Sequence, residues 1–413
     1  MPLLQTSAFA SPEFRRYYAG QTISVVGTWM QSVAAAWLVL QLSHNSALAL
    51  ALYGACQYGP VLVFGLFAGA LVDRLVHRDL LLITQAVSMA GAGVYAALTM
   101  AHVITLPIVF LMAVALGINQ ALYFPARQAT VLGMVGRADL GSAVALNSMA
   151  FNLARIIGPA VAGLVIASSG VAACFWLNAL SYAGVILALL TIRRRPARAR
   201  GVETTLGLIA EGLDYVRRQP ILAALFALLL SASVFGANFT LVLPLFTRVS
   251  LHANADQLGY LFSAQGLGAF TGALTMTVAG RSLLEPRRII LAGIFFGAVE
   301  LLFAIGPTFW QAVAVLLVIG WSFAVYSIGT NTVVQILAPD RMQGRMMSVY
   351  STIFIGTTPF GNVFAGVIAH RWGPGTAVWV GGALTAVTGV AVLISLIARD
   401  AGGTIGHRST GPG

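Results

Sequence analysis

Residues 67–71, Phe-Ala-Gly-Ala-Leu, recur as Phe-Thr-Gly-Ala-Leu at residues 270–274. An Ala-Gly pair at residues 162–163 also recurs at residues 365–366, and both repeats are separated by 203 positions. Ala-Gly pairs are common in apolar helices, so the shared offset carries more weight than either match alone. Equal offsets at corresponding places predict that the chain is an internal duplication of one half.

The composition of the chain is that of a membrane protein. Of its 413 residues, 58% are hydrophobic and 8% are charged, whereas soluble domains carry about 25% charged residues. A helix needs about 20 apolar residues to cross a bilayer, and a helix satisfies its own backbone hydrogen bonds in lipid. The sequence therefore predicts an all-α membrane protein with twelve transmembrane helices in two pseudo-symmetric six-helix bundles. The expected spans are 17–42, 47–72, 80–101, 106–124, 143–167, 171–192, 221–246, 258–279, 289–305, 308–337, 346–369 and 376–398.

The positive charges predict the direction of these spans. All 23 basic residues are Arg. Twenty of them fall in the termini and in alternate loops that share one side, while only Arg248 and Arg371 fall on the other side and Arg155 lies within a span. Positive residues collect on the cytoplasmic side of membrane proteins. We therefore expect a multi-pass membrane protein with both termini in the cytoplasm, and the net charge of +11 does not indicate nucleic-acid binding.

The longest internal polar segment divides the chain into domains. We expect an N-terminal six-helix bundle at residues 1–192, a cytoplasmic linker at 193–220, and a C-terminal six-helix bundle with a short cytoplasmic tail at 221–413. The Arg-rich start of the linker suits anionic lipids. Its second part predicts an amphipathic helix, because apolar residues recur there at helical spacing. These residues are Leu206, Ile209, Leu213 and Val216.

A charged loop follows the second expected span. Residues 69–78, GALVDRLVHR, resemble the loop between helices two and three of the major facilitator superfamily, although Val76 stands where Gly is usual and His77 where a base is usual. The resemblance implies a cytoplasmic gate in which an acid and several bases latch helix ends. A solvated, positively charged loop is the alternative. The implied gate residues are Gly69, Asp73, Arg74, Arg78 and Arg127.

The fifth expected span contains a second motif. Residues 152–163, NLARIIGPAVAG, resemble the fifth-helix motif of exporters in the same superfamily, and packing of small residues is the alternative explanation. The implied motif residues are Arg155, Gly158, Pro159 and Gly163. With residues 17–30 and 125–129, this stretch resembles the bacterial enterobactin-exporter branch, which handles drugs and siderophores. That resemblance covers nearly the whole chain and implies proton-driven export across the bacterial inner membrane.

Family resemblance places the first, fourth, seventh and tenth helices around a substrate cavity. Polar residues at helical spacing mark faces on those helices, with interhelical hydrogen bonding as the alternative for each. The candidate cavity residues are Ser24, Thr28, Gln31, Asn119, Tyr123, Asn152, Phe235, Asn238, Ser327, Asn331 and Gln335.

Two charged residues lie deep within expected spans. Burial of an ionisable side chain in a membrane is costly, so a functional role is the first hypothesis for Arg155 and Glu300. Arg155 could meet an anionic group of the substrate. Glu300 lies on the ninth helix, which is usually peripheral, so we interpret it as a paired structural acid, with proton coupling as the alternative.

Rival classes of function lack their motifs. The sequence has no HExxH, GxSxG or GxxxxGK[ST] pattern, so an enzyme or an ATP-driven pump is not supported. A lysophospholipid flippase or a small-molecule uptake permease on the same fold remain the alternatives to export. The expected partners are a small-molecule substrate, a proton gradient and a bilayer with anionic lipids at the linker. We expect a monomer without cofactor or metal.

Overall fold

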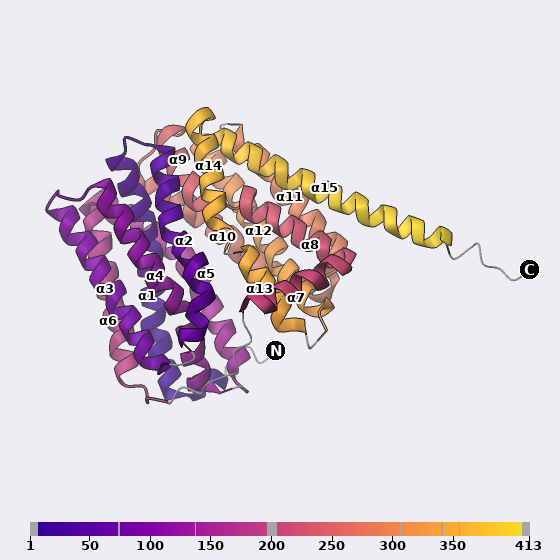
Figure 1. Cartoon of the computed structure of the whole chain (residues 1–413). Coiled ribbons are helices and arrows are strands. Elements are labelled where there is room, and N and C mark those ends of the chain that lie inside the picture. The colour runs from indigo at the N-terminus through magenta and orange to yellow at the C-terminus, as the bar shows by residue number, and fades with distance from the viewer. Residues whose placement is uncertain are drawn as a thin grey trace, which may run out of the picture. The chain divides into compact units, whose positions relative to one another are not determined.

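The computed structural model describes residues 7–72, 75–136, 138–195, 205–305, 308–339, 342–354 and 356–406. Within these ranges the chain is almost entirely helical and no β-strand forms (Figure 1). Two compact units are present, one formed by Met1–Val202 with Thr240–Gly266 and the other by Glu203–Phe239 with Leu267–Gly413. Each is described separately.

The first unit is a bundle of long helices. A short helix, η1 (Ser7–Ala10), precedes α1, whose first turn is capped by Ser11: its Oγ accepts a hydrogen bond from the Phe14 backbone N–H at 3.3 Å, and such a cap satisfies an otherwise free donor. The long helices of this unit are α1 (Pro12–Leu42), α2 (Ala47–Val72), α3 (His77–Met100), α4 (Leu106–Val135), α5 (Leu140–Ser169) and α6 (Val171–Leu190).

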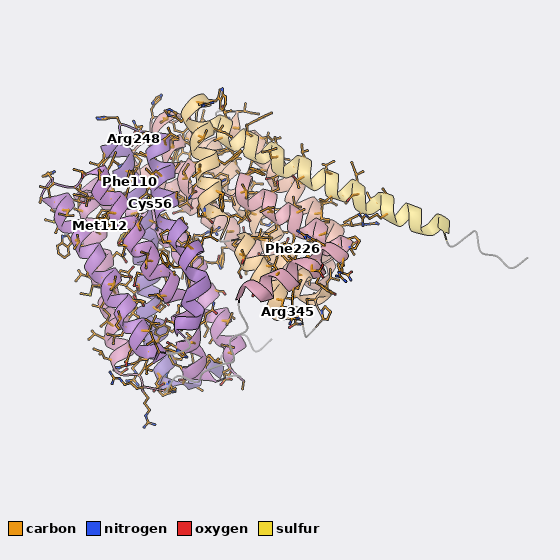
Figure 2. The ribbon with its side chains drawn as sticks, in the orientation of Figure 1. Cys56, Phe110, Met112, Phe226, Arg248 and Arg345 are labelled. Carbon is orange, nitrogen blue, oxygen red and sulfur yellow. The ribbon has the colours of Figure 1, made fainter. Side chains whose placement is uncertain are left out.

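Small residues bring these helices close together. A Cβ added to Gly20 in α1 would lie 2.7 Å from the carbonyl oxygen of Gly184 in α6, so the two backbones meet with no side chain between them. Close approach through glycine is typical of membrane helices, where dispersion contacts drive association. Parts of α9 (Phe239–Val249) and α10 (Ala255–Ala279) also belong to this unit. The guanidinium of Arg248 in α9, a residue labelled in Figure 2, lies 4.9 Å from the ring centre of Trp37 in α1.

The second unit contains the linker helix and the remaining helices. Two of its expected spans are interrupted: residues 221–246 form α8, a π-helical turn and α9, and residues 346–369 form α13 and α14. The elements are α7 (Thr205–Arg218), α8 (Pro220–Ser231), the π-helical turn η2 (Ala232–Gly236), the start of α9, the second part of α10, η3 (Gly280–Leu283), α11 (Pro286–Ala304), α12 (Phe309–Leu337), α13 (Gln343–Phe354), α14 (Thr358–Trp372) and α15 (Pro374–Gly406).

Ten helices of the described chain are long and apolar enough to cross a membrane. The expected spans at 258–279 and 289–305 form helices α10 and α11 but are not among the ten. Glycine and threonine lower the hydropathy of α10, and α11 carries Arg287, Arg288 and Glu300 within 19 residues. The helical membrane fold is confirmed, and the count of twelve spans stays a prediction.

The linker helix α7 packs against α13. A Cβ on Gly212 would lie 2.8 Å from Cγ2 of Val349 and 3.1 Å from the carbonyl oxygen of Arg345. Val216 is buried, whereas Leu213, expected on the apolar face, is 39% exposed. The described contact face of α7 is therefore centred on Gly212 and Val216, and it is covered by protein.

Candidate functional site

The expected cytoplasmic gate is described only in part. Asp73 and Arg74 lie outside the described residues, and Gly69 lies in the last turns of α2, where the side-chain surroundings are not described. Arg78, in the first turn of α3, binds the end of α6: its Nε donates to the carbonyl oxygen of Leu189 at 3.0 Å and its Nη2 to that of Leu190 at 3.2 Å. Arg78 thus caps a helix C-terminus within its own unit.

Two carboxylates that the sequence analysis did not single out hold the start of the linker. Asp79 accepts from Arg78 at 2.8 Å and pairs with Arg194 at 3.1 Å. Glu13, in the first turn of α1, pairs with Arg195 at 2.8 Å and accepts from the backbone N–H of Arg193 at 3.2 Å. Each acid lies in the first turn of its helix, and residues 193–195 are three consecutive Arg. These two features of the sequence could have indicated the pairs.

A polar cluster joins α1, α4 and α5. Gln21 of α1 donates from Nε2 to the hydroxyl of Tyr123 at 2.9 Å. The Arg127 guanidinium lies 6.0 Å from the ring centre of Tyr123 and donates to Oδ1 of Asn147 at 3.1 Å. Two predicted residues, Tyr123 and Arg127, therefore come together, and Gln21 and Asn147 join them. We call these four residues the Tyr123 cluster.

The polar face of α1 is directed at α6. Thr28 Oγ1 lies 3.4 Å from the hydroxyl of Tyr182, and Gln31 Oε1 accepts from Nδ2 of Asn178 at 2.6 Å. Ser24 is buried, and its backbone carbonyl accepts from the Thr28 hydroxyl at 2.9 Å. Interhelical hydrogen bonding accounts for Thr28 and Gln31, as the alternative interpretation of this face expects.

Two further cavity candidates also bind other groups of the protein. Asn119 of α4 donates from Nδ2 to the carbonyl oxygen of Thr84 at 3.0 Å and to the hydroxyl of Ser88 at 2.9 Å, both in α3. Asn152 of α5 donates to the carbonyl oxygen of Ser148 at 2.8 Å. Asn119 therefore joins two helices, and Asn152 bonds within its own helix.

The fifth-helix motif makes close backbone contacts on two sides. A Cβ on Gly158 would lie 2.5 Å from Cβ of Trp29 in α1. On the other side, Gly163 and the Pro159 carbonyl meet the first part of α10, since a Cβ on Gly163 would lie 2.7 Å from the carbonyl oxygen of Ala255. Arg155 is half-buried and makes no hydrogen bond or ion pair within the part of the chain that the structure describes.

The candidates on α12 form a short hydrogen-bonded run. Gln335 donates from Nε2 to Oδ1 of Asn331 at 2.5 Å. The hydroxyl of Ser327 donates to the Ala324 carbonyl at 3.4 Å, and the hydroxyl of Tyr350 in α13 donates to the Ser327 carbonyl at 3.2 Å. Asn331 and Gln335 therefore pair with each other along one face of α12.

Glu300 is enclosed in the second unit. Its exposed fraction is 0%, and neither carboxyl oxygen has a hydrogen-bond partner among the described residues. The pairing expected from the sequence is therefore not seen in the described part. The carboxyl lies beside Gly236 of η2 and Gly382 of α15. Two cavity candidates belong to the same interrupted span: Phe235 lies in η2, and Asn238 lies two residues after its end.

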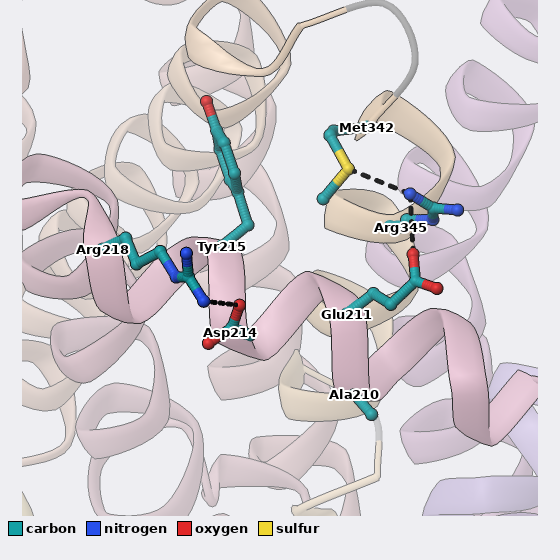
Figure 3. Close-up of a pocket in the computed structure, with 7 residues that line it drawn as sticks. All are labelled: Ala210, Glu211, Asp214, Tyr215, Arg218, Met342 and Arg345. Atoms are coloured by element: carbon teal, nitrogen blue, oxygen red, sulfur yellow. Dashed lines mark hydrogen bonds and ion pairs between the residues drawn. The ribbon is translucent and has the colours of Figure 1, made fainter.

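A surface recess of about 500 Å³ lies between α7 and α13 (Figure 3). It is lined by two ion pairs, Glu211 with Arg345 at 2.7 Å and Asp214 with Arg218 at 2.8 Å. None of the predicted cavity residues lines it. The described residues contain no group of His, Cys, Asp or Glu side chains able to hold a metal ion.

Comparison with known proteins agrees with this architecture. The profile of the transmembrane secretion effector family matches residues 5–403. The multidrug efflux pump Tap of Mycolicibacterium fortuitum is 29% identical over 84% of this chain and 87% of its own length. The enterobactin exporter EntS of Salmonella typhimurium is 27% identical over 93% of this chain and 92% of its own length.

Solved structures share the fold. A POT family transporter in complex with 5-aminolevulinic acid has a TM-score of 0.74 at 11% identity and covers 93% of this chain and 96% of its own. A bacterial homologue of the iron transporter ferroportin, in an inward-facing state, has a TM-score of 0.69 at 15% identity and covers 96% and 99%. From the family match and these likenesses, the chain belongs to the transmembrane secretion effector family of the major facilitator superfamily and is a multi-pass inner-membrane transporter, not an enzyme.

Proposed function

We propose that this transporter exports small amphipathic molecules, such as drugs, siderophores or secondary metabolites, in exchange for protons by alternating access. The observation that carries the proposal is the match, over most of both chains, to a multidrug efflux pump and to an enterobactin exporter. Both relatives export, although the cargo in their names differs. The shared property is therefore direction, and an amphipathic cargo is the class that suits both.

The described contacts support roles for particular residues. Arg155 is a half-buried cation in the motif-bearing helix α5 and has no partner among the described side chains, so it is available to an anionic group of the cargo. Burial of an unpaired charge in a membrane is costly unless function retains it. The Tyr123 cluster offers an amide, a phenol and a guanidinium on α1 and α4, which suits polar groups on an amphipathic molecule.

The cytoplasmic gate remains part of the proposal. Gly69, Asp73 and Arg74 carry the resemblance to the superfamily loop, and Arg78 fixes the start of α3 to the end of α6. We infer that both termini and this loop lie in the cytoplasm, because the Arg residues alternate between loops as the positive-inside tendency requires. The anionic-lipid contact is assigned to the Arg-rich start of the linker.

The proposal is tested by transport into inside-out membrane vesicles with an imposed pH gradient. The panel holds fluorescent cationic dyes, catecholate siderophores and lysophospholipids, and vesicles without the protein are the control. Accumulation that depends on the gradient and collapses with a protonophore is expected for at least one dye or siderophore. Transport of lysophospholipids alone would favour the flippase.

Direction is tested with the same panel in right-side-out vesicles. Gradient-driven accumulation of a panel compound there, with no accumulation of any compound in inside-out vesicles, would favour uptake and overturn the export proposal. Accumulation that persists after the protonophore would overturn proton coupling.

A further inference from the structure

The span at residues 220–249 is broken near its middle. Helix α8 ends at Ser231, and the π-helical turn η2 follows, closed by a hydrogen bond from the Ala237 N–H to the Ala232 carbonyl at 2.8 Å. Helix α9 begins at Phe239. No proline lies between Pro220 and Pro244. The break therefore needs a physical cause other than proline. Local π-helical turns occur frequently at functional sites.

The break is stabilised by one side chain and two glycines. Nδ2 of Asn238 donates to the carbonyl oxygens of Val234 and Phe235, at 2.8 and 3.2 Å, and so satisfies acceptors that a continuous helix would have used. Gly361 of α14 lies against this amide, since a Cβ there would be 2.5 Å from Oδ1 of Asn238. Gly381 of α15 lies against the Phe235 carbonyl, with no room for a side chain.

Glu300 faces the next residue of the same turn. A Cβ on Gly236 would lie 3.0 Å from Oε2 of Glu300 and 3.1 Å from Oγ1 of Thr385. A Cβ on Gly382 would lie 3.4 Å from the same Oε2. The hydroxyl of Thr385 already donates to the Gly381 carbonyl at 2.9 Å. The carboxyl is therefore enclosed by backbone and by a hydroxyl whose proton is committed elsewhere.

The described surroundings of Glu300 hold no counter-ion. Among described residues, the titratable side chains on the elements packed against α11 are Tyr326 of α12, whose ring lies against Gly293, and Arg399 near the end of α15; α8 and η2 carry none. On α11 itself, the basic side chains are Arg288 and Arg287, about 18 and 20 Å away along the helix axis at 1.5 Å per residue. An ionised carboxylate in this place would be both desolvated and unpaired.

We propose that the Glu300 carboxyl is the proton-binding group of this transporter and that its charge sets the conformation of the interrupted span α8–η2–α9. In the conformation described, the group is neutral and the turn closes over it. Loss of the proton creates a charge that requires donors, so the turn must move away or reorient. The hydroxyl of Ser233, buried in η2 without a partner in the described chain, is one donor that a reoriented turn could supply.

This inference rests on the proposed proton-coupled transport, because it assigns the coupling group. It also gives the coupling a path. A movement of η2 when Glu300 changes charge would displace Phe235, which lies in η2, and Asn238, which follows it, and both are among the residues expected to line the substrate cavity. The proton is favoured over a metal cation because the enclosure offers one carboxyl and no second acid among the described residues.

The test combines infrared spectroscopy with hydrogen exchange on the purified, reconstituted protein. A pH titration in the infrared should show a protonated carboxyl band that is present in the wild type and in Glu285→Gln but absent in Glu300→Gln. Glu285 is a matched control, because it precedes the same helix and is an exposed partner of Arg288. A band unchanged in Glu300→Gln would overturn the proposal.

Hydrogen exchange of the 220–249 segment reads the conformation. If opening requires loss of one proton, the opening equilibrium rises by up to about tenfold per pH unit. At each pH, the exchange rate of the segment in the wild type is divided by its exchange rate in Glu300→Gln. This ratio should still rise with pH by up to the same factor, and Glu285→Gln should give the same ratio as the wild type. Equal profiles in wild type and Glu300→Gln, or a response to Na⁺ at constant pH, would overturn the proposal. Gly236→Ala, which crowds the carboxyl without removing it, should shift the titration.

Transport assays separate this inference from the proposed function. If wild-type export does not follow the pH gradient but the band and the exchange behave as expected, proton-coupled export fails and the buried proton site stands. If export follows the gradient and Glu300→Gln keeps the same pH dependence, the assignment of Glu300 fails and proton-coupled export stands.

Discussion

Gly158→Ala isolates the packing role of the fifth-helix motif. The added Cβ would lie 2.5 Å from Cβ of Trp29 and 2.9 Å from the carbonyl oxygen of Val26. Ordinary contact begins at 3.4 Å, so α1 and α5 must separate by about 0.9 Å, and the backbone of Val26 cannot rotate away. Overpacking of this kind costs about 1–3 kcal/mol. Alanine in a helix recovers about 0.5–1 kcal/mol relative to glycine, which leaves a net loss of up to about 2.5 kcal/mol.

The measurement is the apparent midpoint of thermal unfolding in detergent at a fixed scan rate, because unfolding of such proteins is often irreversible. Gly93→Ala in α3 is the control: a Cβ there meets nothing within 4 Å, so the same chemical change should leave the midpoint unchanged or raise it. A midpoint for Gly158→Ala that equals or exceeds that of Gly93→Ala would refute the packing argument. Loss of transport at an unchanged midpoint would instead assign Gly158 to gating.

Three further substitutions test the remaining assignments. Arg155→Gln should lower kcat/KM for anionic cargo by about tenfold or more, the worth of one charge-assisted hydrogen bond, and leave cationic dyes unaffected; equal losses for both would exclude an anion contact. Asp79→Asn should speed tryptic cleavage at Arg194, because the carboxylate that binds it is neutralised; an unchanged rate would show that the pair does not hold the linker. A double-mutant cycle of Glu211→Gln and Arg345→Gln should give a coupling free energy of about 0.2–1 kcal/mol in stability, because Glu211 is 58% exposed and exposed ion pairs contribute little to stability. If the effects of the two substitutions on stability add, the pair has no coupling.

Apolar runs were sufficient to predict most of the helices, because lipid imposes the same length and hydropathy on every span. The breaks were not predictable in the same way. Residues 221–246 form one continuous apolar run in the sequence, yet the helix divides at η2. Asn238 donates hydrogen bonds to the freed carbonyls, and Gly361 and Gly381 leave room for the Asn238 amide and the Phe235 carbonyl. These are contacts between distant parts of the sequence, and hydropathy carries no information about them.

The candidate site was predictable at the level of residue type. Polar residues inside spans were found from their helical spacing and from the family resemblance. Their partners were not found, since Gln31 binds Asn178 and Asn119 binds Thr84 and Ser88 across helices. Glu300 shows the same limit. An acid in a span suggests a partner, and only the fold reveals that its neighbours are the glycine backbone of Gly236 and Gly382, with the uncharged Thr385 beside them.

The anchoring of the linker at both ends decides where the chain can be divided into two separately expressed fragments. Glu13 and Asp79 hold Arg195 and Arg194 on the first unit, and Gly212 seats α7 on α13 of the second. A cut between Arg195 and Thr205 leaves both anchor points within their own fragments. A cut after Arg218 would place α7 and α13 in different fragments. The C-terminal fragment would then expose the apolar strip of α13 that α7 covers, and it would be prone to aggregate.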